Sequence, residues 1–185
     1  MSDNLIRTFP IQTPRLYLRQ FVMSDAVKAY DNWMSDDDVT EFLTWETHRS
    51  SEESERAIER WIRSYDLGTM DWCITLRQKR EPIGSITAVQ DFPEEGYCEL
   101  GYCIAKEHWG KGYMTEAVGA VTVSIFRNTG YKWIQARCDL ENYGSRRCLE
   151  KCNYRFVADL GLPCGKRGGE IRTYRIMRID RRDVS

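Results

Sequence analysis

The sequence lacks any apolar stretch long enough to cross a membrane. A transmembrane helix needs about 20 consecutive apolar residues, and no run in this chain approaches that length. The first residues, M-S-D-N-L-I-R-T-F-P, also lack the apolar core of a signal peptide. These absences predict a cytoplasmic protein that does not contact a membrane.

An excess of charge of either sign is also missing. The 27 lysine and arginine residues nearly balance the 28 aspartate and glutamate residues, and the formal net charge is -1. The chain therefore has no global basic field that would attract nucleic acid, and no acidic excess typical of a charged tail. We expect no direct nucleic-acid partner, and we expect local charge to matter more than net charge.

Cysteine is present, but the spacing that marks a zinc or redox site is not. The cysteines are odd in number, and no two of them stand in a C-x-x-C arrangement. Most lie in apolar segments, so we interpret them as buried, reduced thiols rather than as disulfides or metal ligands. The sequence thus predicts no metal site. The seven are Cys73, Cys98, Cys103, Cys138, Cys148, Cys152 and Cys164.

The order of apolar and polar residues predicts a single α/β domain over residues 1–185. The length is sufficient for a substantial core, and no repeat, low-complexity segment or domain boundary interrupts it. Strand patterns occur at residues 15–21, 71–77, 82–92, 97–105, 132–139, 154–159 and 171–179. Helical patterns occur at residues 24–33, 39–43, 50–65, 113–128 and 142–152. The expected helix caps are Ser24 or Asp25 for the first helix, Ser50 for the third and Gly130 for the fourth.

The segment from Glu99 to Glu116, E-L-G-Y-C-I-A-K-E-H-W-G-K-G-Y-M-T-E, joins a strand to a helix through a glycine turn. The strand pattern ends at Ala105, a basic turn with Gly110 and Gly112 follows, and the helical pattern begins directly after it. The N–H groups at a helix start bind phosphate oxygens, and glycines let the backbone approach a ligand closely. The segment therefore predicts an anion site.

Two common phosphate motifs are excluded by the residues around Lys111. A P-loop requires G-x-x-x-x-G-K-[ST], but Lys111 is followed by Gly112, so no hydroxyl is available for magnesium. The dinucleotide fingerprint G-x-G-x-x-G fails because Thr115 stands where the third glycine is required. These mismatches argue against nucleotide hydrolysis and against a Rossmann site.

The remaining candidate is the pyrophosphate loop of the GNAT superfamily, the acetyl-CoA-dependent N-acetyltransferases, which this turn resembles. The signature of that loop is [QR]-x-x-G-x-[GA], and here it reads W-G-K-G-Y-M with Gly112 as the central glycine. Trp109 replaces the usual Gln or Arg, and Met114 replaces the last small residue. Both substitutions concern the side-chain contacts of the loop rather than its backbone contacts.

The resemblance is closest to the Rim-type branch, which acetylates N-terminal amines of ribosomal proteins, and it covers almost the whole chain. T-P-R-L-Y-L-R at residues 13–19 is similar to the opening strand of that branch, and E-L-G-Y at residues 99–102 to its fourth strand. N-Y-G-S-R-R-C-L-E-K-C-N-Y at residues 142–154 resembles its N-x-x-S-x-x-x-L-E-K-x-G-[FY] segment. Asn153 stands where glycine is usual, and asparagine also tolerates a left-handed conformation.

This resemblance implies the GNAT fold and acetyl-CoA as co-substrate, with no metal. The expected sheet is mixed and mostly antiparallel, with helices on both faces and with parallel strands four and five that splay apart to admit acetyl-CoA. N–H groups near Cys103, Ile104 and Ala105 are implied to pair with the pantetheine chain and to stabilise the oxyanion. The other implied cofactor-binding residues are Trp109, Gly110, Lys111, Gly112, Tyr113, Met114, Thr115 and Asn142.

Glu99 and Ser145 are the catalytic residues that the resemblance implies. Glu99 matches a strand-four glutamate that serves as the base in some GNAT enzymes. Ser145 occupies the position from which a hydroxyl can hydrogen-bond the leaving sulfur. Many GNAT enzymes use a tyrosine just after the leucine of this segment, but here Glu150 follows Leu149.

The residues themselves leave other roles open. Glu99 can be a salt-bridged strand residue, and Asn142 and Ser145 can be simple helix caps. His108 is a second candidate for the base. Cys103 is a candidate acetyl-enzyme nucleophile, although the sequence shows no partner that would activate it.

The implied reaction is direct acetyl transfer to a primary amine in a ternary complex. The implied acceptor is a protein N-terminal α-amine, such as that of a ribosomal protein. A small amine such as a polyamine or aminoglycoside is a second hypothesis, which the acidic residues 36–38, Glu41 and Glu46 could serve. A CoA-sensing or ribosome-associated module without catalysis is a third. We expect a monomer or a homodimer.

Overall fold

The computed structural model describes residues 7–184, which form an eight-stranded sheet with surrounding helices. Neighbouring strands lie in the order β1-β2-β3-β4-β5-β6-β8-β7, and every pair is antiparallel except β5 with β6. This confirms the mixed, mostly antiparallel sheet. The strands are β1 (Ile11–Gln12), β2 (Leu16–Arg19), β3 (Asp71–Leu76), β4 (Pro82–Phe92), β5 (Tyr97–Ile104), β6 (Trp133–Asp139), β7 (Arg155–Cys164) and β8 (Glu170–Asp180).

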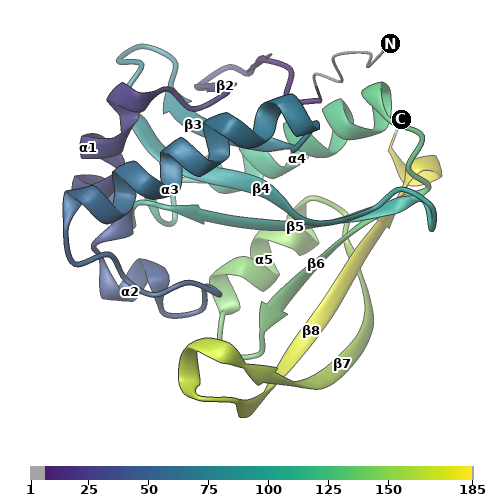
Figure 1. Cartoon of the computed structure of the whole chain (residues 1–185). Coiled ribbons are helices and arrows are strands. Elements are labelled where there is room, and N and C mark those ends of the chain that lie inside the picture. Colours follow the sequence, from purple (N-terminus) through teal and green to yellow (C-terminus); the bar gives the residue numbers. More distant parts are fainter. Residues whose placement is uncertain (1–6, 185) are drawn as a thin grey trace.

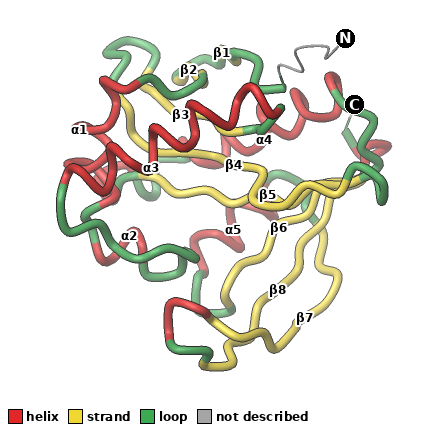
Figure 2. Tube along the Cα trace, viewed as in Figure 1, coloured by secondary structure: helices red, strands yellow, loops and turns green. Residues whose placement is uncertain are grey.

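Helices cover both faces of the sheet, as Figure 1 shows. Helices α1 and α3 lie on one face, whereas α4 and α5 lie on the other. Short α2 lies near the end of β5 that leads to the glycine turn, and the turn of the β7–β8 hairpin is close below it (Figure 2). The helices are α1 (Ala26–Ala29), α2 (Asp37–Thr40), α3 (Ser51–Ser64), α4 (Tyr113–Asn128) and α5 (Tyr143–Lys151).

Strands β5 and β6 are paired along only part of their length. Their parallel register runs from Tyr97 with Trp133 to Leu100 with Ala136. Beyond those residues both strands continue, β5 to Ile104 and β6 to Asp139, without pairing to each other. These are the strands predicted as the fourth and fifth, because β1 precedes the first predicted strand. Their parallel course and their separation are confirmed.

Alternation along β3 explains why the sheet has a core on each face. Trp72 and Ile74 are fully buried in the core that includes α4, whereas Cys73 between them is buried in the core beneath α1 and α3. Each large side chain buried in this way contributes about 1.5–3 kcal/mol relative to exposure. The residues of β5 also divide between the two cores, so packing fixes this strand from both sides.

Several predicted elements have the expected bounds. Strand β4 and helix α4 coincide with the predicted ranges, 82–92 and 113–128. Helix α3 begins directly after Ser50, and the chain leaves its last turn through Gly68, whose φ of 79° is left-handed. Asn153 has a φ of 63°, the left-handed conformation expected there.

The first predicted helix differs from a regular α-helix. It begins with a 3₁₀ turn at Met23–Asp25, continues as α1, and ends in a π-helical turn at Tyr30–Met34. Asp25 is the residue directly before α1, but its side chain makes no capping hydrogen bond. Its carboxylate lies within the first turn, accepts the N–H of Val22 at 2.9 Å and pairs with Arg19 at 2.7 Å.

Three other boundaries also depart from the prediction. Helix α2 ends at Thr40, so residues 41–43 lie beyond it in a turn. Strand β7 extends to Cys164 because its apolar end pairs with the start of β8, which shortens the predicted loop to a tight turn. The predicted cap at Gly130 is wrong: α4 ends at Asn128 and its C-cap is Thr129, whose hydroxyl donates to the carbonyl of Ile125 at 2.8 Å.

Membrane-spanning helices are absent from residues 7–184, where no helix is both long and apolar enough for that role. All seven cysteines are free thiols, and five of them are buried. The burial of most cysteines agrees with the sequence interpretation.

Candidate active site

The glycine turn before α4 has a backbone that only glycine adopts easily. Gly110 and Gly112 have φ values of 71° and 76°, both in the left-handed region. Gly112 is the N-cap of α4, and the first N–H to enter the helix is that of Glu116, which donates to the Gly112 carbonyl. The N–H groups between these residues have no intrahelical acceptor, so they are available to an anion.

The unpaired end of β5 presents backbone groups to the gap between β5 and β6. Ala105 donates its N–H to the carbonyl of Ile83 at 2.8 Å. Because antiparallel neighbours alternate between bonded and non-bonded pairs, Cys103 also faces β4, whereas the backbone groups of Tyr102 and Ile104 point toward the gap. The expectation for this strand is therefore corrected: Ile104 can offer its N–H to a ligand, Cys103 and Ala105 cannot, and Tyr102 was missed.

Trp109, the residue that departs from the loop signature, joins the loop to this strand. Its indole N–H donates to the carbonyl of Ile104 at 2.9 Å. The bond occupies one backbone acceptor that faces the gap and connects the end of β5 to the glycine turn.

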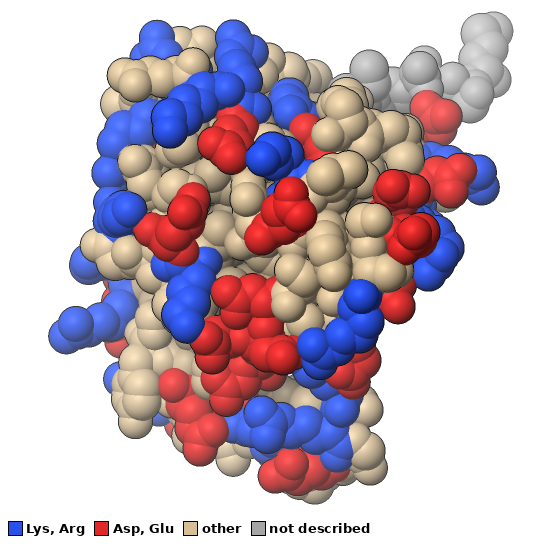
Figure 3. All heavy atoms as spheres, turned by 90° about the vertical axis from the view of Figure 1, so that its left-hand side faces the viewer, with Lys and Arg blue, Asp and Glu red and all other residues tan. Residues whose placement is uncertain are grey.

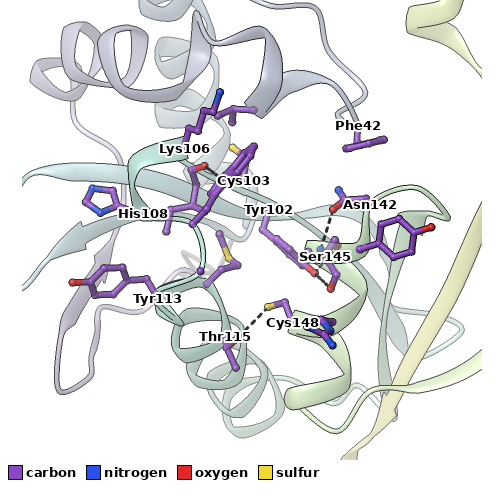
Figure 4. A pocket seen from close by; sticks show the side chains of 18 of the residues that line it. Phe42, Tyr102, Cys103, Lys106, His108, Tyr113, Thr115, Asn142, Ser145 and Cys148 are labelled. Carbon is purple, nitrogen blue, oxygen red and sulfur yellow. Dashed lines mark hydrogen bonds between the residues drawn. The ribbon is translucent and has the colours of Figure 1, made fainter.

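Helix α5 brings Asn142 and Ser145 to the other side of the gap. The Asn142 side chain caps the helix by accepting the N–H of Ser145 at 2.9 Å. The hydroxyl of Tyr102 lies 2.8 Å from Ser145 Oγ and 3.3 Å from the Ser145 carbonyl. Figure 4 shows these three side chains close together. Burial raises the pKa of Tyr102, so its phenol stays protonated at neutral pH.

One cavity of about 770 Å³ joins these groups. That volume suits a drug-sized or larger ligand. All the predicted site residues line it except Glu99, Ala105 and Lys111. Phe42 and the acidic residues Asp38 and Glu41, which the sequence offered as candidates for the acceptor side, also line it. Sequence reasoning did not predict several of its other lining residues: Tyr102, Lys106, Tyr143 and Cys148. Alternation along β5 could have identified Tyr102, whereas the others come from segments that only the fold brings together.

Glu99, the predicted base, does not line this cavity. It is 3% exposed, and both of its carboxylate oxygens have partners on β6. Arg137 Nε lies 2.6 Å from one oxygen, and the Gln135 amide donates to the other at 2.8 Å. Glu99 is thus a salt-bridged strand residue by its contacts.

His108 and Cys103 also have definite surroundings. Figure 4 shows His108 beside Tyr113, pointing away from Ser145. Burial lowers the pKa of His108 although Glu107 lies 2.9 Å from its Nε2. Burial raises the pKa of the Cys103 thiol to about 11, which disfavours the thiolate that a nucleophile requires.

Comparisons with known proteins agree on one family. Residues 15–155 match the Acetyltransferase (GNAT) domain. The uncharacterized N-acetyltransferase YoaA of Bacillus subtilis (strain 168) is 32% identical over 148 residues, which is 79% of this chain and 83% of that protein.

Solved structures show the same fold at lower identity. An acetyltransferase (GNAT family) from Bacillus anthracis superposes with a TM-score of 0.82 at 23% identity, covering 94% of this chain and 99% of that one. RimL, a ribosomal L7/L12 alpha-N-protein acetyltransferase in complex with coenzyme A, has a TM-score of 0.81 at 14% identity, covering 96% and 100%.

The cavity has the features that acetyl-CoA requires. The free N–H groups of the left-handed glycine turn suit a pyrophosphate, and the backbone groups of Tyr102 with the N–H of Ile104 suit the amides and carbonyl of an acetylated pantetheine chain. Groups of three or more His, Cys, Asp or Glu side chains that could hold a metal are absent from the described residues. The chain belongs to the GNAT family of acetyltransferases, and it is an N-acetyltransferase whose co-substrate is acetyl-CoA.

Proposed function

We propose that the enzyme acetylates the α-amine of a polypeptide N-terminus, such as that of a ribosomal protein, by direct transfer in a ternary complex. The observation that carries this proposal is the continuity of the cavity. It extends from the start of α4, past the unpaired end of β5, to Asp38 and Val39 in α2 and residues 41–43 after it. A donor and an acceptor can therefore occupy one space, as direct transfer requires.

The proposed cofactor residues divide into three groups. Gly110, Lys111 and Gly112, with the first turn of α4 (Tyr113, Met114 and Thr115), bind the pyrophosphate. The backbone groups of Tyr102 bind the pantetheine chain, and Trp109 holds that strand end through the Ile104 carbonyl. Asn142 orients the start of α5 beside them. The N–H of Ile104 is the proposed donor to the oxyanion, an interaction of about 2.7–4 kcal/mol in acyl transfer.

Ser145 is proposed to stabilise the departing thiolate, and Tyr102 to hold the Ser145 hydroxyl in position. If the phenol donates to Ser145 Oγ, the serine hydrogen is free to point toward the sulfur. A hydrogen bond to a charged atom contributes about 1.5–3 kcal/mol.

Removal of a proton from the attacking amine is the remaining requirement. At pH 7, neutralising a lysine amine costs about 4–5 kcal/mol, whereas an α-amine with a pKa near 7.7–8.0 costs only ~1 kcal/mol. An N-terminal acceptor therefore needs little help from a base to lose its proton. Glu99 remains the proposed base, and it would act through a change in its pairing with Arg137 or at a distance through water.

A small cationic amine is the second candidate acceptor. Asp38, Glu41 and Glu141 line the cavity, and Figure 3 shows acidic groups gathered on the face that carries α2. Basic groups lie against all three, since Lys106 pairs with Asp38, Arg172 lies 2.5 Å from Glu141, and Arg167 lies 3.8 Å from Glu41. These ion pairs neutralise much of the acidic charge that would attract a small cationic amine. We therefore favour the peptide acceptor.

Acetyl transfer to a panel of acceptors tests the proposal. The purified enzyme is supplied with acetyl-CoA and with short peptides that differ in their N-terminal residue, and kcat/KM is compared with that for spermidine and an aminoglycoside. We expect the highest kcat/KM for a peptide with a free N-terminus and none for the same peptide when its N-terminus is blocked. Faster turnover of spermidine than of every peptide would replace the first candidate with the second.

A further inference from the structure

The segment before β2 is bonded to the first turn of α4, although about a hundred residues separate them. Glu116 Oε1 accepts the hydroxyl of Thr13 at 2.6 Å and the N–H of Arg15 at 2.9 Å. Glu116 Oε2 lies 2.6 Å from Arg15 Nε. The same guanidinium stacks 4.5 Å from the centroid of the Tyr113 ring. Four contacts therefore converge on the start of α4 from one short segment.

Arg15 also controls the orientation of a peptide group in the glycine turn. Its Nη1 donates to the carbonyl of Lys111 at 2.8 Å. In a trans peptide the carbonyl and the following N–H point in opposite directions, so this bond turns the N–H of Gly112 away from Arg15. Glycines flank Lys111 on both sides, and their broad conformational freedom would otherwise let this peptide rotate. The Arg15 bond removes that freedom.

Glu116 presents an electrostatic problem for a phosphate site. A carboxylate in the first turn of a helix is stabilised by the helix dipole, but next to the pyrophosphate it adds a like charge. Burial opposes ionisation of Glu116, yet the hydrogen bonds from Thr13 and Arg15 outweigh burial and lower the pKa of its carboxyl, so it is ionised at neutral pH. The guanidinium that binds it supplies the compensating charge.

We propose that Arg15 is a positioning residue for the CoA phosphates: it neutralises the charge of Glu116 and fixes the Lys111–Gly112 peptide so that the turn binds an anion. The inference rests on the proposed pyrophosphate site at this turn. It gives the T-P-R-L segment a role in the acetyl-CoA site in addition to its place in the sheet.

Calorimetric titration with CoA and with pantetheine, which lacks the pyrophosphate and the 3′-phosphate, tests this inference. Arg15→Gln should raise the Kd for CoA by about 10-fold, an effect of the size expected for a charge near a helix terminus. The Kd for pantetheine should not change. Arg63→Gln is the matched control, because Arg63 is an exposed arginine paired with Glu59 on α3, outside the cavity. That control should bind CoA as the wild type does.

A second substitution separates charge compensation from simple structural support. Glu116→Gln should bind CoA within about 3-fold of the wild type, and Arg15→Gln/Glu116→Gln should bind it more tightly than Arg15→Gln alone, because the uncompensated carboxylate is gone. Arg15→Lys, which keeps the charge, should recover part of the affinity. A double variant no better than Arg15→Gln, or an equal loss for CoA and pantetheine, would overturn the inference. Failure of the wild type to bind CoA would instead refute the proposed site itself.

Discussion

The hydroxyl of Tyr102 lies 2.8 Å from Ser145 Oγ, across the gap where β5 and β6 separate. One residue comes from the strand and the other from the first turn of α5, and both line the same cavity. This pair puts two neutral hydroxyls beside the unpaired strand end. The proposed stabilisation of the departing thiolate depends on this contact between the two hydroxyls.

Removing either hydroxyl should slow turnover. We expect Ser145→Ala to lower kcat by about 10- to 150-fold, which corresponds to one hydrogen bond to a charged atom, and Tyr102→Phe to lower it by less. Steady-state kinetics at saturating acetyl-CoA measure both. Tyr154→Phe is the control, because it breaks a hydroxyl pair of the same length, with Thr122, outside this cavity. Equal kcat values in all three variants would contradict the assigned roles.

Glu99→Gln should distinguish a base from a structural ion pair by its dependence on pH. If Glu99 removes the amine proton, kcat/KM for a peptide falls at pH 7 and recovers near pH 9, where an α-amine is already neutral. The variant should also be less stable, because Arg137 loses its partner. Arg137→Leu, which breaks the same pair but keeps the carboxylate, is the control. A loss that is the same at every pH in both variants would leave Glu99 with a structural role only.

Trp109→Phe should weaken acetyl-CoA binding. Phenylalanine keeps an aromatic ring but loses the N–H that binds the Ile104 carbonyl, and one such bond contributes about 0.5–1.5 kcal/mol. The KM for acetyl-CoA should therefore rise by about 2- to 10-fold with little change in kcat. Trp133→Phe, on β6 and outside the cavity, should leave the KM unchanged. An unchanged KM in Trp109→Phe would show that the bond does not support the strand end.

Gly84→Ala should damage both the fold and the site. A Cβ at Gly84 would lie 2.3 Å from the carbonyl oxygen of Cys103 and 2.9 Å from the Cα of Ile104, and backbone atoms cannot move aside as a flexible side chain does. We expect a loss of about 1–3 kcal/mol in the free energy of unfolding, measured by urea denaturation. Gly119→Ala in α4 has open space around its Cβ and should be neutral or stabilising. A Gly84→Ala variant of wild-type stability would refute the close approach.

CoA should protect Cys148 from alkylation. The neighbouring Cys152 thiol lowers the pKa of the Cys148 thiol although burial opposes it, and the hydroxyl of Thr115 donates to the Cys148 sulfur at 3.7 Å. Cys148 also lines the cavity, so a bound ligand should cover it. Mass spectrometry after iodoacetamide treatment measures the rate at each thiol. Cys164, at the end of β7 and outside the cavity, is an internal reference whose rate CoA should not change.

Local patterns in the sequence predicted elements whose own residues determine their form. Helix α4 follows Gly112 because only glycine adopts the left-handed N-cap conformation easily, and β4 follows from its run of strand-forming residues. The family resemblance added the parallel pair and its separation. The length of β7 could not be predicted in the same way, because its pairing with β8 decides it.

The sequence by itself determined where an anion could bind, since the glycine turn and the start of α4 are local features of residues 110–116. Only the tertiary structure decided which groups surround that turn. Because backbone hydrogen bonding alternates along β5, the N–H groups of Cys103 and Ala105 face β4 and are not available to a ligand. The pairing of β5 with β6 places Glu99 against Gln135 and Arg137, which bind its carboxylate. Long-range contacts also brought Tyr102 to Ser145 and Arg15 to Glu116. Such contacts depend on how distant segments pack, and the spacing of residues along one chain does not encode that directly.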